Sequence, residues 1–140
     1  MERTVVHARG HEHVTAEHTS TLELTSDDYL TPAGDCILGI DADTVPTEFD
    51  DAFVAACQSE NAVITATLEA AGHTAVVEGA GHHDLVFEND RSHVLRTSDY
   101  VDDRTVMVDA DAAAADIDRT LVDALADGAH LTLTLTVESV

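Results

Sequence analysis

Histidines are concentrated near the beginning of the chain, and their spacing could serve a metal ion. His11 and His13 lie two positions apart in the run Gly10-His11-Glu12-His13. On an extended segment their imidazoles would point to the same side and could grip one ion. Glu17 or His18 could supply a third ligand and leave one position open for water. The pattern predicts a divalent metal ion held by His11, His13 and His18, and the alternative is that these histidines are polar surface groups.

The spacing His-x-His-x3-Glu is also half of the metal signature of cupins, which are β-sandwich proteins. The other half requires Pro-x-Gly followed closely by a histidine. Here Pro32-Ala33-Gly34 leads into Asp35 and Cys36 instead. The match to that signature is therefore partial.

A Gly-Asp turn at Gly34-Asp35 enters an apolar run and is a second candidate for chemistry. Asp35 could cap the backbone amides of a tight corner, or it could orient an imidazole as carboxylates beside metal-ligating histidines do. Cys36 would be a nucleophile only if a neighbouring histidine or helix N-terminus lowered its pKa. The apolar Ile37 and Leu38 that follow favour a buried thiol, and we expect Cys57 to lie in the core.

Two further groups complete the candidates. The loop Gly79-Ala80-Gly81-His82-His83 could bring its backbone close to a ligand, but it opens no helix and lacks a phosphate-binding fingerprint. The alternative is a hairpin tip. Arg96 and Arg104 lie in or beside expected strands, and a guanidinium offers a bidentate contact to a carboxylate or phosphate. The alternative for each arginine is an ion pair with the abundant acids.

Composition excludes several classes of function. The chain has 140 residues, 44% of them hydrophobic, which suits one domain with its own core. It has 28 acidic residues against 6 basic ones, all arginine, and a net charge of −22. A basic face for nucleic acid and attachment to an anionic membrane are therefore excluded. No apolar run approaches the roughly 18 residues of a membrane span, and no signal peptide opens the chain. Two cysteines without metal or redox spacing predict reduced thiols and a cytoplasmic location.

The charge itself indicates an environment. A net charge of −22 opposes compaction, and the Debye length falls from about 8 Å at physiological salt to about 3 Å at 1 M. This composition therefore predicts a halophilic protein. An acidic mimic of nucleic acid would need its acids on one face, whereas they are spread along the chain after residue 25. Residues 1–25 carry only four acids and two arginines, which suggests that this segment is buried or constrained by a site.

Hydrophobic periodicity predicts a mainly β domain with two helices. We expect the first helix after an N-cap at Thr47, and the second between a cap at Asp109 or Asp111 and Gly128. A hairpin is expected at Gly72-His73, and we find no internal repeat. The expected strands cover residues 2–8, 20–25, 35–40, 62–70, 74–78, 84–88, 93–97, 104–108 and 131–137.

Segments spread over nearly the whole chain resemble the archaeal family catalogued as domain of unknown function 371, in its haloarchaeal form. These segments are RGHEHVTAEHTSTLELT, LTPAGDCILGI, GH, RTSDY and RTVMVDADAAAADI. The resemblance implies a jelly-roll-like β-sandwich and no particular activity. His13 departs from the family pattern, where asparagine is usual, which favours His11, His18 and His82 as the histidines of a site. The chain matches the pattern at His11, His18, Thr21, Glu23, Gly34, Asp35, Cys36, Gly81, His82, Arg96, Ser98 and Arg104.

Two hypotheses follow for the single domain of residues 1–140. In the first, the domain carries a small-molecule or metal site, and histidine acid–base chemistry would suit hydrolysis or isomerisation. In the second, the same polar residues form a loop network or a subunit contact of a non-catalytic interaction protein. A homo-oligomer is compatible with the sequence. The residues of the first hypothesis are His11, His18, Asp35 and His82 as catalytic groups, and Glu23, Cys36, Arg96, Ser98 and Arg104 as binding groups for a small anionic ligand.

Overall fold

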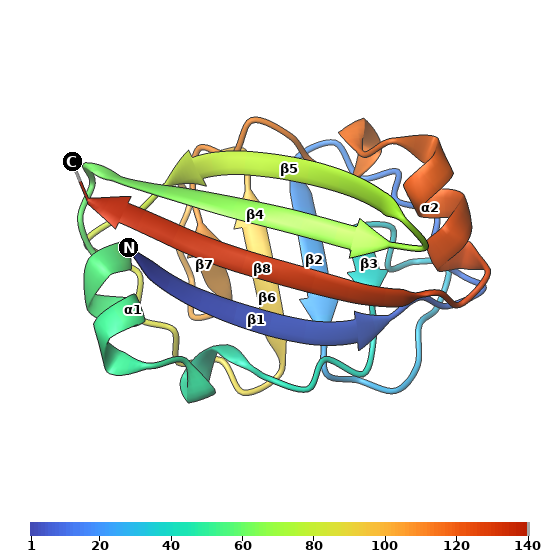
Figure 1. Ribbon diagram of the computed structural model, residues 1–140, viewed down its shortest axis with the longest axis horizontal. Coiled ribbons are helices and arrows are strands. Elements are labelled where there is room, and N and C mark those ends of the chain that lie inside the picture. The colour runs from blue at the N-terminus through green and yellow to red at the C-terminus, as the bar shows by residue number, and fades with distance from the viewer. Residues whose placement is uncertain (140) are drawn as a thin grey trace.

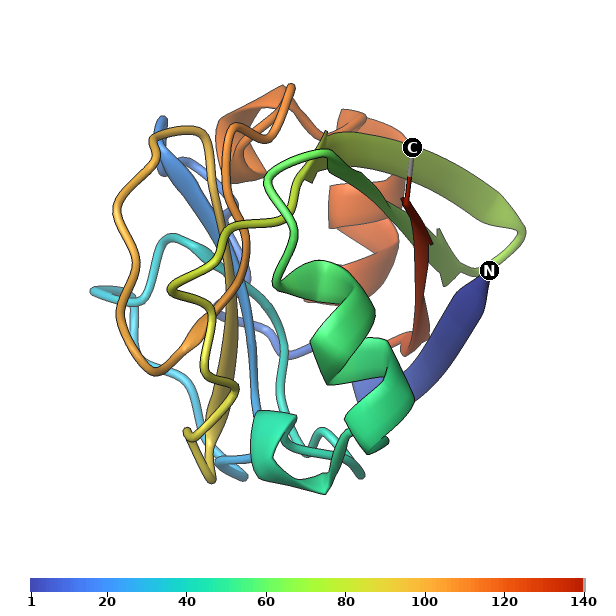
Figure 2. The same cartoon turned by 90° about the vertical axis from the view of Figure 1, so that its left-hand side faces the viewer.

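Two four-stranded sheets face each other and enclose the core in the computed structural model, which describes residues 1–139 (Figures 1 and 2). Sheet A consists, in spatial order, of β1 (Glu2–Arg9), β8 (His130–Ser139), β4 (Ala62–Ala70) and β5 (His73–Ala80). Sheet B consists, in spatial order, of β3 (Ile37–Gly39), β2 (Thr21–Thr25), β6 (Ser92–Arg96) and β7 (Thr105–Met107).

The mainly β class with two helices is confirmed, but the pairing of the strands differs between the sheets. Sheet A is antiparallel throughout. In sheet B only the central pair, β2 with β6, is antiparallel, while β3 and β7 each run parallel to their neighbour. A jelly roll is built from antiparallel strands, so this detail of the expected fold is not confirmed.

The inner face of sheet A shows why these segments form strands. Along β8, the side chains of Leu131, Leu133, Leu135 and Val137 are at most 1% exposed, and the threonines between them point to the other face. This period of two is that of a strand with one buried face. The tight turn after β4 is also as predicted, because Ala71 and Gly72 have φ angles of 51° and 81°, as a two-residue hairpin turn requires.

The helices begin later than expected. The first segment forms a 3-10 turn, η1 (Pro46–Glu48), and only then the helix α1 (Asp51–Cys57), with Asp50 rather than Thr47 at the N-cap. The second forms η2 (Ala114–Asp116) and then α2 (Arg119–Ala126). Its cap is Asp118, whose side chain accepts the Thr120 N–H, so the expected caps Asp109 and Asp111 were wrong. The two helices lie at opposite ends of the sandwich (Figure 1).

One expected strand is absent among the described residues, and one loop is shorter than expected. Residues 84–88 alternate as a strand would, with Leu85 and Phe87 buried, but they form no strand. Phe87 has a φ of 52°, in the left-handed region that breaks extended backbone. The glycine-rich loop begins only after Ala80, because Gly79 still belongs to β5.

The chain is built as two copies of one unit, which corrects the expectation that it has no internal repeat. Each copy runs through three strands, a 3-10 turn, a helix and a long strand, from β1 to β4 and again from β5 to β8. The copies share unusual backbone as well as element order. Ala16 and Phe87 have φ angles of 49° and 52°, and Asp41 and Asp109 have φ angles of 54° and 52°.

The repeat is hard to detect in the sequence, because the two copies have the same residues at a few turn positions and different residues elsewhere. Gly10-His11 of the first copy corresponds to Gly81-His82 of the second, and Tyr29 corresponds to Tyr100, all at the same spacing. Between these positions most residues differ, since a buried strand accepts many apolar side chains at constant volume.

Candidate functional site

The structure does not bring the expected histidine trio together. His11 follows β1 and His82 follows β5, and these strands form the two edges of sheet A. The successive antiparallel pairings make β1 and β5 run in opposite directions, so the two histidines leave the sheet at diagonally opposite corners (Figure 1). The expectation that His11, His18 and His82 meet in one hollow was therefore wrong.

Each of these corner histidines closes its own loop. His11 Nδ1 accepts the His13 N–H at 3.0 Å, and His82 Nδ1 accepts the Asp84 N–H at 3.0 Å. The glycine before each histidine lies against the end of a helix, because a Cβ on Gly10 would meet the Leu125 carbonyl of α2. A Cβ on Gly81 would likewise meet the Cys57 carbonyl of α1. Both Gly-His pairs are thus corners of the repeated unit.

The hydrogen bonds of these imidazoles also argue against metal binding. A backbone N–H can only donate, so Nδ1 must offer its lone pair and the neutral ring carries its proton on Nε2. A protonated Nε2 is a donor and not a metal ligand. This holds for His11 and His82, and for His18, whose Nδ1 accepts the N–H groups of Ser20 and Thr21 at 3.2 Å and 3.1 Å.

Within residues 1–139, the side chains that could coordinate a metal ion do not gather at the predicted metal site either. His11 and His13 are neighbours, with ring centroids 5.2 Å apart, but His18 does not join them. The one set of three candidate donors within 4.8 Å of one another in this part of the chain is Glu60, His82 and His83. Since Nδ1 of His82 is taken by backbone, its Nε2–H faces Glu60, at 3.9 Å from the carboxylate.

Most of the other motif residues gather on the outer face of sheet B. The antiparallel pairing of β2 with β6 sets Thr21 opposite Arg96 and Glu23 opposite Val94. Cys36 then lies beside Glu23, because the Glu23 N–H donates to the Cys36 carbonyl at 2.9 Å. We call this group the sheet B cluster, and its members are Thr21, Glu23, Cys36, Arg96, Asp102 and Arg104.

The thiol of the sheet B cluster is held next to a carboxylate. Cys36 Sγ donates to Glu23 Oε1 at 3.6 Å. Burial raises the pKa of the Cys36 thiol, and the negative charge and hydrogen bond of Glu23 raise it further, to about 11. A hydrogen bond from Thr21 opposes this shift in part. At neutral pH the group is therefore a thiol. Within residues 1–139 no histidine or helix N-terminus lowers its pKa, so an attack by this sulfur would depend on a base in contact with it, as Glu23 is.

Asp35 acts through its backbone and not through its carboxylate. Its carbonyl accepts the N–H groups of Glu17 and His18 at 3.0 Å and 3.3 Å. This contact fastens the histidine-rich segment to the turn that leads into β3. Within residues 1–139 the Asp35 carboxylate makes no hydrogen bond to an imidazole, so its expected role in orienting one is not what the structure shows.

Two guanidinium groups share one carboxylate at the other side of the sheet B cluster. Asp102 Oδ2 lies 2.9 Å from Arg96 Nη2 and 3.0 Å from Arg104 Nη2, and Arg96 Nε donates to Thr105 Oγ1 at 2.8 Å. Burial alone would raise the pKa of Asp102, but the hydrogen bonds from Arg104 and Arg96 outweigh it and lower this pKa to about 2. Two guanidinium groups thus share the carboxylate of Asp102, and the charge of Glu23, the second acid of the cluster, also acts on Arg104.

Aromatic and hydroxyl groups of the neighbouring loop have different roles. The Arg96 guanidinium lies over the Tyr100 ring, 4.9 Å from its centroid, a distance that suits a cation–π contact. Ser98, a predicted ligand-binding residue, is exposed, and its Oγ accepts the Tyr100 N–H at 3.4 Å. Ser98 therefore shapes the loop rather than joining the sheet B cluster.

The internal repeat places the thiol and one guanidinium at equivalent positions. The Val94 N–H donates to the Arg104 carbonyl at 2.9 Å, just as the Glu23 N–H donates to the Cys36 carbonyl. The paired residues Glu23 and Val94 therefore mark the centre of the outer face. The first copy contributes the thiol and its carboxylate there, and the second contributes the cations.

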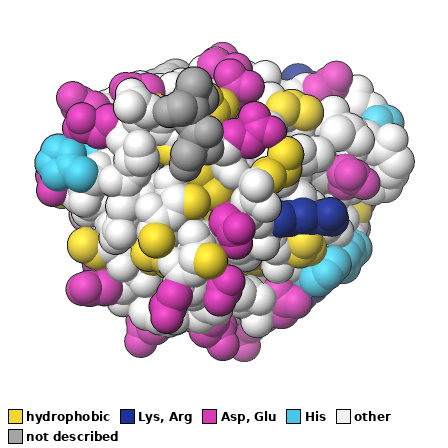
Figure 3. All heavy atoms as spheres, turned by 60° about the vertical axis from the view of Figure 1, so that its left-hand side comes forward, with side chains coloured by type: hydrophobic (Ala, Val, Ile, Leu, Met, Phe, Trp, Pro, Cys, Tyr) yellow, Lys and Arg dark blue, Asp and Glu magenta, His cyan; other side chains and the backbone are white. Residues whose placement is uncertain are grey.

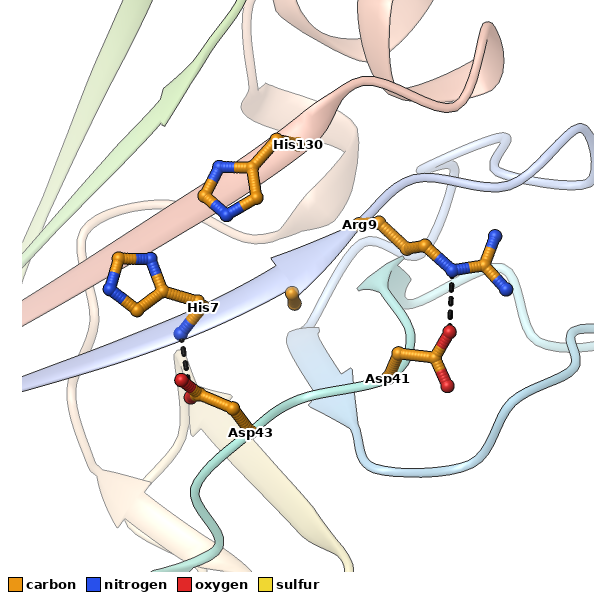
Figure 4. A pocket seen from close by; sticks show the side chains of 6 residues that line it. His7, Arg9, Asp41, Asp43 and His130 are labelled. Atoms are coloured by element: carbon orange, nitrogen blue, oxygen red, sulfur yellow. Dashed lines mark hydrogen bonds and ion pairs between the residues drawn. The ribbon is translucent and has the colours of Figure 1, made fainter.

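A separate hollow of about 230 Å³ lies on the outer face of sheet A at the edge of β1 (Figure 4). Within it the rings of His7 and His130 are 5.3 Å apart, and Arg9 pairs with Asp41 at 2.5 Å. Asp43 Oδ1 accepts the His7 N–H at 2.9 Å.

The aspartate of this hollow has a structural role. In the second copy Asp111 Oδ1 accepts the Glu78 N–H at 3.0 Å in the same way. The repeated Asp-Ala-Asp segments therefore fasten edge strands to the chain that follows β3 and β7. We conclude that the acidic side of the hollow is explained by the fold.

Sequence reasoning missed the residues that surround the cations. Asp102, Thr105 and Tyr100 were not singled out, although the run Asp102-Asp103-Arg104-Thr105 sets acids beside a rare arginine. That proximity, in a chain with 6 basic residues, was the available signal.

The rest of the surface is acidic without a focus. Acidic side chains are scattered over the face shown in Figure 3 and form no single patch there. Within the described residues, the helices are too short and too polar to cross a membrane.

Residues 6–138 match the family model described as Domain of unknown function (DUF371). A relative from Methanocaldococcus jannaschii, named Uncharacterized protein MJ0206, is 38% identical over 127 residues. The alignment covers 91% of this chain and 93% of that relative. The chain therefore belongs to the DUF371 family.

Proposed function

We propose that this member of the DUF371 family binds a small anionic ligand on the outer face of sheet B, with Arg104 and Arg96 holding the anionic group. The observation that carries the proposal is that two guanidinium groups share the single carboxylate of Asp102. In a chain with 6 basic residues, two guanidinium groups at one place are unusual, and their geometry suits a carboxylate or phosphate partner.

The donors of Arg104 support this role. Its Nε and Nη2 atoms are occupied by Asp102, while Nη1 makes no hydrogen bond within residues 1–139. The side chain is 37% exposed, and guanidinium geometry is suited to a carboxylate or phosphate oxygen. Arg96 is almost buried and acts as the fixed second charge behind it.

The competing explanation is that Arg96, Asp102 and Arg104 only fasten the loop between β6 and β7. Binding of inorganic phosphate and of succinate, measured by calorimetry at a constant KCl concentration of about 1 M, distinguishes the two. At that ionic strength the Debye length is about 3 Å, so the general negative field no longer repels the probes and only local contacts act.

The decisive variants are Arg104→Gln and the matched control Arg91→Gln, which removes an exposed arginine outside the sheet B cluster. We expect Arg104→Gln to weaken binding of the better probe about tenfold, the loss of one charge-assisted hydrogen bond. Arg91→Gln should bind as the wild type does. Equal affinities in all three proteins, or no heat with either probe, would contradict the proposal.

A second candidate function is a protein–protein contact at the same face. Tyr29 and Tyr100 occupy equivalent positions in the two copies and are 61% and 59% exposed. Tyrosine and arginine are enriched at the centres of interfaces, so a homo-oligomer could form through this face. Sedimentation analysis of the wild type and of Tyr29→Ser/Tyr100→Ser tests it, and a monomer at all concentrations rules it out for self-association.

We further propose that the protein works in the cytoplasm of a halophilic archaeon. The support is physical. The chain has 28 acidic residues and no lysine, and the acidic side chains on the face shown in Figure 3 are scattered. Such charges repel one another less at molar salt. Divalent metal is not part of the proposed site, because the backbone donors at His11, His18 and His82 oppose ligation.

A further inference from the structure

We propose that Cys36 is the nucleophile of an acyl-transfer site and that Glu23 takes the thiol proton. The substrate class is an ester, thioester or amide of an acid that carries a second, anionic group. The inference rests on the proposed function, because Arg104 would hold that anionic group while the thiol meets the carbonyl carbon.

The contact between the thiol and the carboxylate is the first support. Cys36 Sγ already donates to Glu23 Oε1 at 3.6 Å, which is the nucleophile-to-base arrangement of covalent catalysis. Glu23 is fixed within β2, between β3 on one side and β6 on the other. Neither residue is fully buried, so a small substrate can approach the pair.

The charge arrangement is the second support. Arg104 occupies the position equivalent to Cys36 across the Glu23–Val94 pair, and the negative charge of Glu23 is among the causes that raise the pKa of its guanidinium. A substrate that spans this pair would place its carbonyl at the thiol and its anionic group at the guanidinium. The internal repeat thus provides the two ends of one site.

The raised pKa of the thiol sets a requirement that only a base in contact with it can meet. Because burial and Glu23 raise the pKa of Cys36 to about 11, little thiolate exists at neutral pH, and an attack requires proton removal as the S–C bond forms. Within residues 1–139, Glu23 is the carboxylate hydrogen-bonded to Cys36. The other cysteine, Cys57, is fully buried and serves as an internal control.

The steps balance as follows. Cys36 Sγ attacks the carbonyl carbon, its proton passes to Glu23, and the bond to the leaving group breaks with its electron pair to give a thioester. Glu23 returns the proton to the leaving group. Water then attacks the thioester, giving its proton to Glu23, which passes it to the departing Cys36 thiolate. The sum is an ester, thioester or amide plus water, giving an acid plus an alcohol, thiol or amine.

The test uses mono-4-nitrophenyl succinate, an activated ester with an anionic end, and its neutral counterpart 4-nitrophenyl butyrate. The carboxylate of the succinate ester already speeds its own hydrolysis, so rates are compared with those in the absence of protein. We expect the intact wild-type chain at pH 7.5 to accelerate nitrophenolate release by a larger factor for the succinate ester than for the butyrate. Mass spectrometry should locate a succinyl group on Cys36 and none on Cys57. Absence of an adduct on Cys36 overturns the inference, and Cys36→Ser should form no thioester.

The variant Glu23→Gln distinguishes a Glu23 that accepts the thiol proton from a Glu23 that only raises the thiol pKa by its charge. If Glu23 takes the proton, the variant acylates Cys36 at least about tenfold more slowly at neutral pH. If Glu23 merely suppresses the thiolate by its charge, the variant has a lower thiol pKa and acylates faster. The matched control Asp28→Asn removes an exposed carboxylate and should leave the rate unchanged, and melting curves confirm that each variant is folded.

Arg104→Gln separates this inference from the proposed function. Loss of the preference for the anionic ester, with Cys36 still acylated by the butyrate, supports both statements. A preference that survives in Arg104→Gln contradicts anion binding by Arg104 and leaves the roles of Cys36 and Glu23 to be judged by Glu23→Gln. An unchanged or faster rate in Glu23→Gln contradicts the acyl-transfer inference alone.

Discussion

The imidazole of His18 and the amide of Asn89 occupy equivalent positions in the two copies and close the same turn. His18 Nδ1 accepts the N–H groups of Ser20 and Thr21, and Asn89 Oδ1 accepts those of Arg91 and Ser92 at 2.9 Å and 2.7 Å. Each also accepts, through its carbonyl, an N–H of the 3-10 turn of the other copy. The role of His18 is therefore that of an acceptor at a turn, which an amide can replace.

This equivalence predicts the behaviour of two variants. His18→Asn should keep the stability of the wild type to within about 0.5 kcal/mol, while His18→Ala should lose about 1–2 kcal/mol, as for the loss of a capping side chain. Urea unfolding measures both. A comparable loss in both variants would show that the imidazole itself is required.

Gly10 and Gly81 should be equally intolerant of a side chain. A Cβ would meet the carbonyl of Leu125 or of Cys57, and neither helix end can retreat from a strand it already contacts. We expect Gly10→Ala and Gly81→Ala each to destabilise the fold by about 3 kcal/mol. The control is Gly72→Asn, where φ is 81° and no atom lies within 4 Å, and asparagine tolerates such backbone. A melting temperature of Gly10→Ala or Gly81→Ala equal to that of the wild type would contradict the close approach of strand and helix.

His93 should make the fold sensitive to mild acid. Burial lowers the pKa of His93 to about 4, although its Nε2 lies 2.6 Å from the Thr44 carbonyl. The unfolded chain takes up this proton near pH 6.5, so stability is complete above that pH and falls as the pH drops toward 4. The loss should reach about 3 kcal/mol.

His93→Gln retains a donor for the Thr44 carbonyl and removes the titration. Its free energy of unfolding should therefore vary less between pH 6.5 and pH 4 than that of the wild type. His7→Gln, a change of an exposed histidine, should keep the wild-type slope. Parallel pH profiles for wild type and His93→Gln would refute the assignment.

Asp102 should dominate the response to stronger acid. Its pKa of about 2 in the folded protein lies below the value of about 3.9 in an unfolded chain. The stability it contributes is therefore present above about pH 4 and is lost as the pH falls toward 2. Asp102→Asn should cost about 2 kcal/mol at pH 7, because Arg96 is left nearly buried without its carboxylate.

The difference between wild type and Asp102→Asn should shrink as the pH is lowered from 5 toward 2. The adjacent exposed acid provides the control, since Asp103→Asn should follow the wild-type curve. A pH-independent difference would mean that Asp102 acts through packing and not through charge.

Salt should stabilise the protein strongly. With a net charge of −22, raising KCl from about 0.1 M to about 2 M shortens the Debye length and weakens repulsion between the scattered carboxylates. We expect the melting temperature to rise steeply over this range. A flat response would contradict the halophilic interpretation.

Local patterning was sufficient to predict most of the elements. The alternation of leucine and threonine in β8 and the turn at Gly72 depend on neighbours in the sequence, and both were found where expected. The failures were also local in cause. Residues 84–88 alternate like a strand, but Phe87 has a left-handed backbone. The equivalent residue of the first copy, Ala16, has the same conformation, and no residue type shared by the two positions predicts it.

The amino-acid order alone established a mainly β chain with two helices, an acidic surface and a short set of reactive residue types. It could not say which of these residues are neighbours. Cys36 meets Glu23, 13 positions away, because β3 runs parallel to β2, and Arg96 meets Asp102 because a loop folds back over sheet B. Such contacts depend on strand order and register, which are set by the burial of a whole core and not by the spacing of any motif. For the same reason His11 and His82, whose surroundings look alike along the chain, lie at opposite corners of the folded molecule.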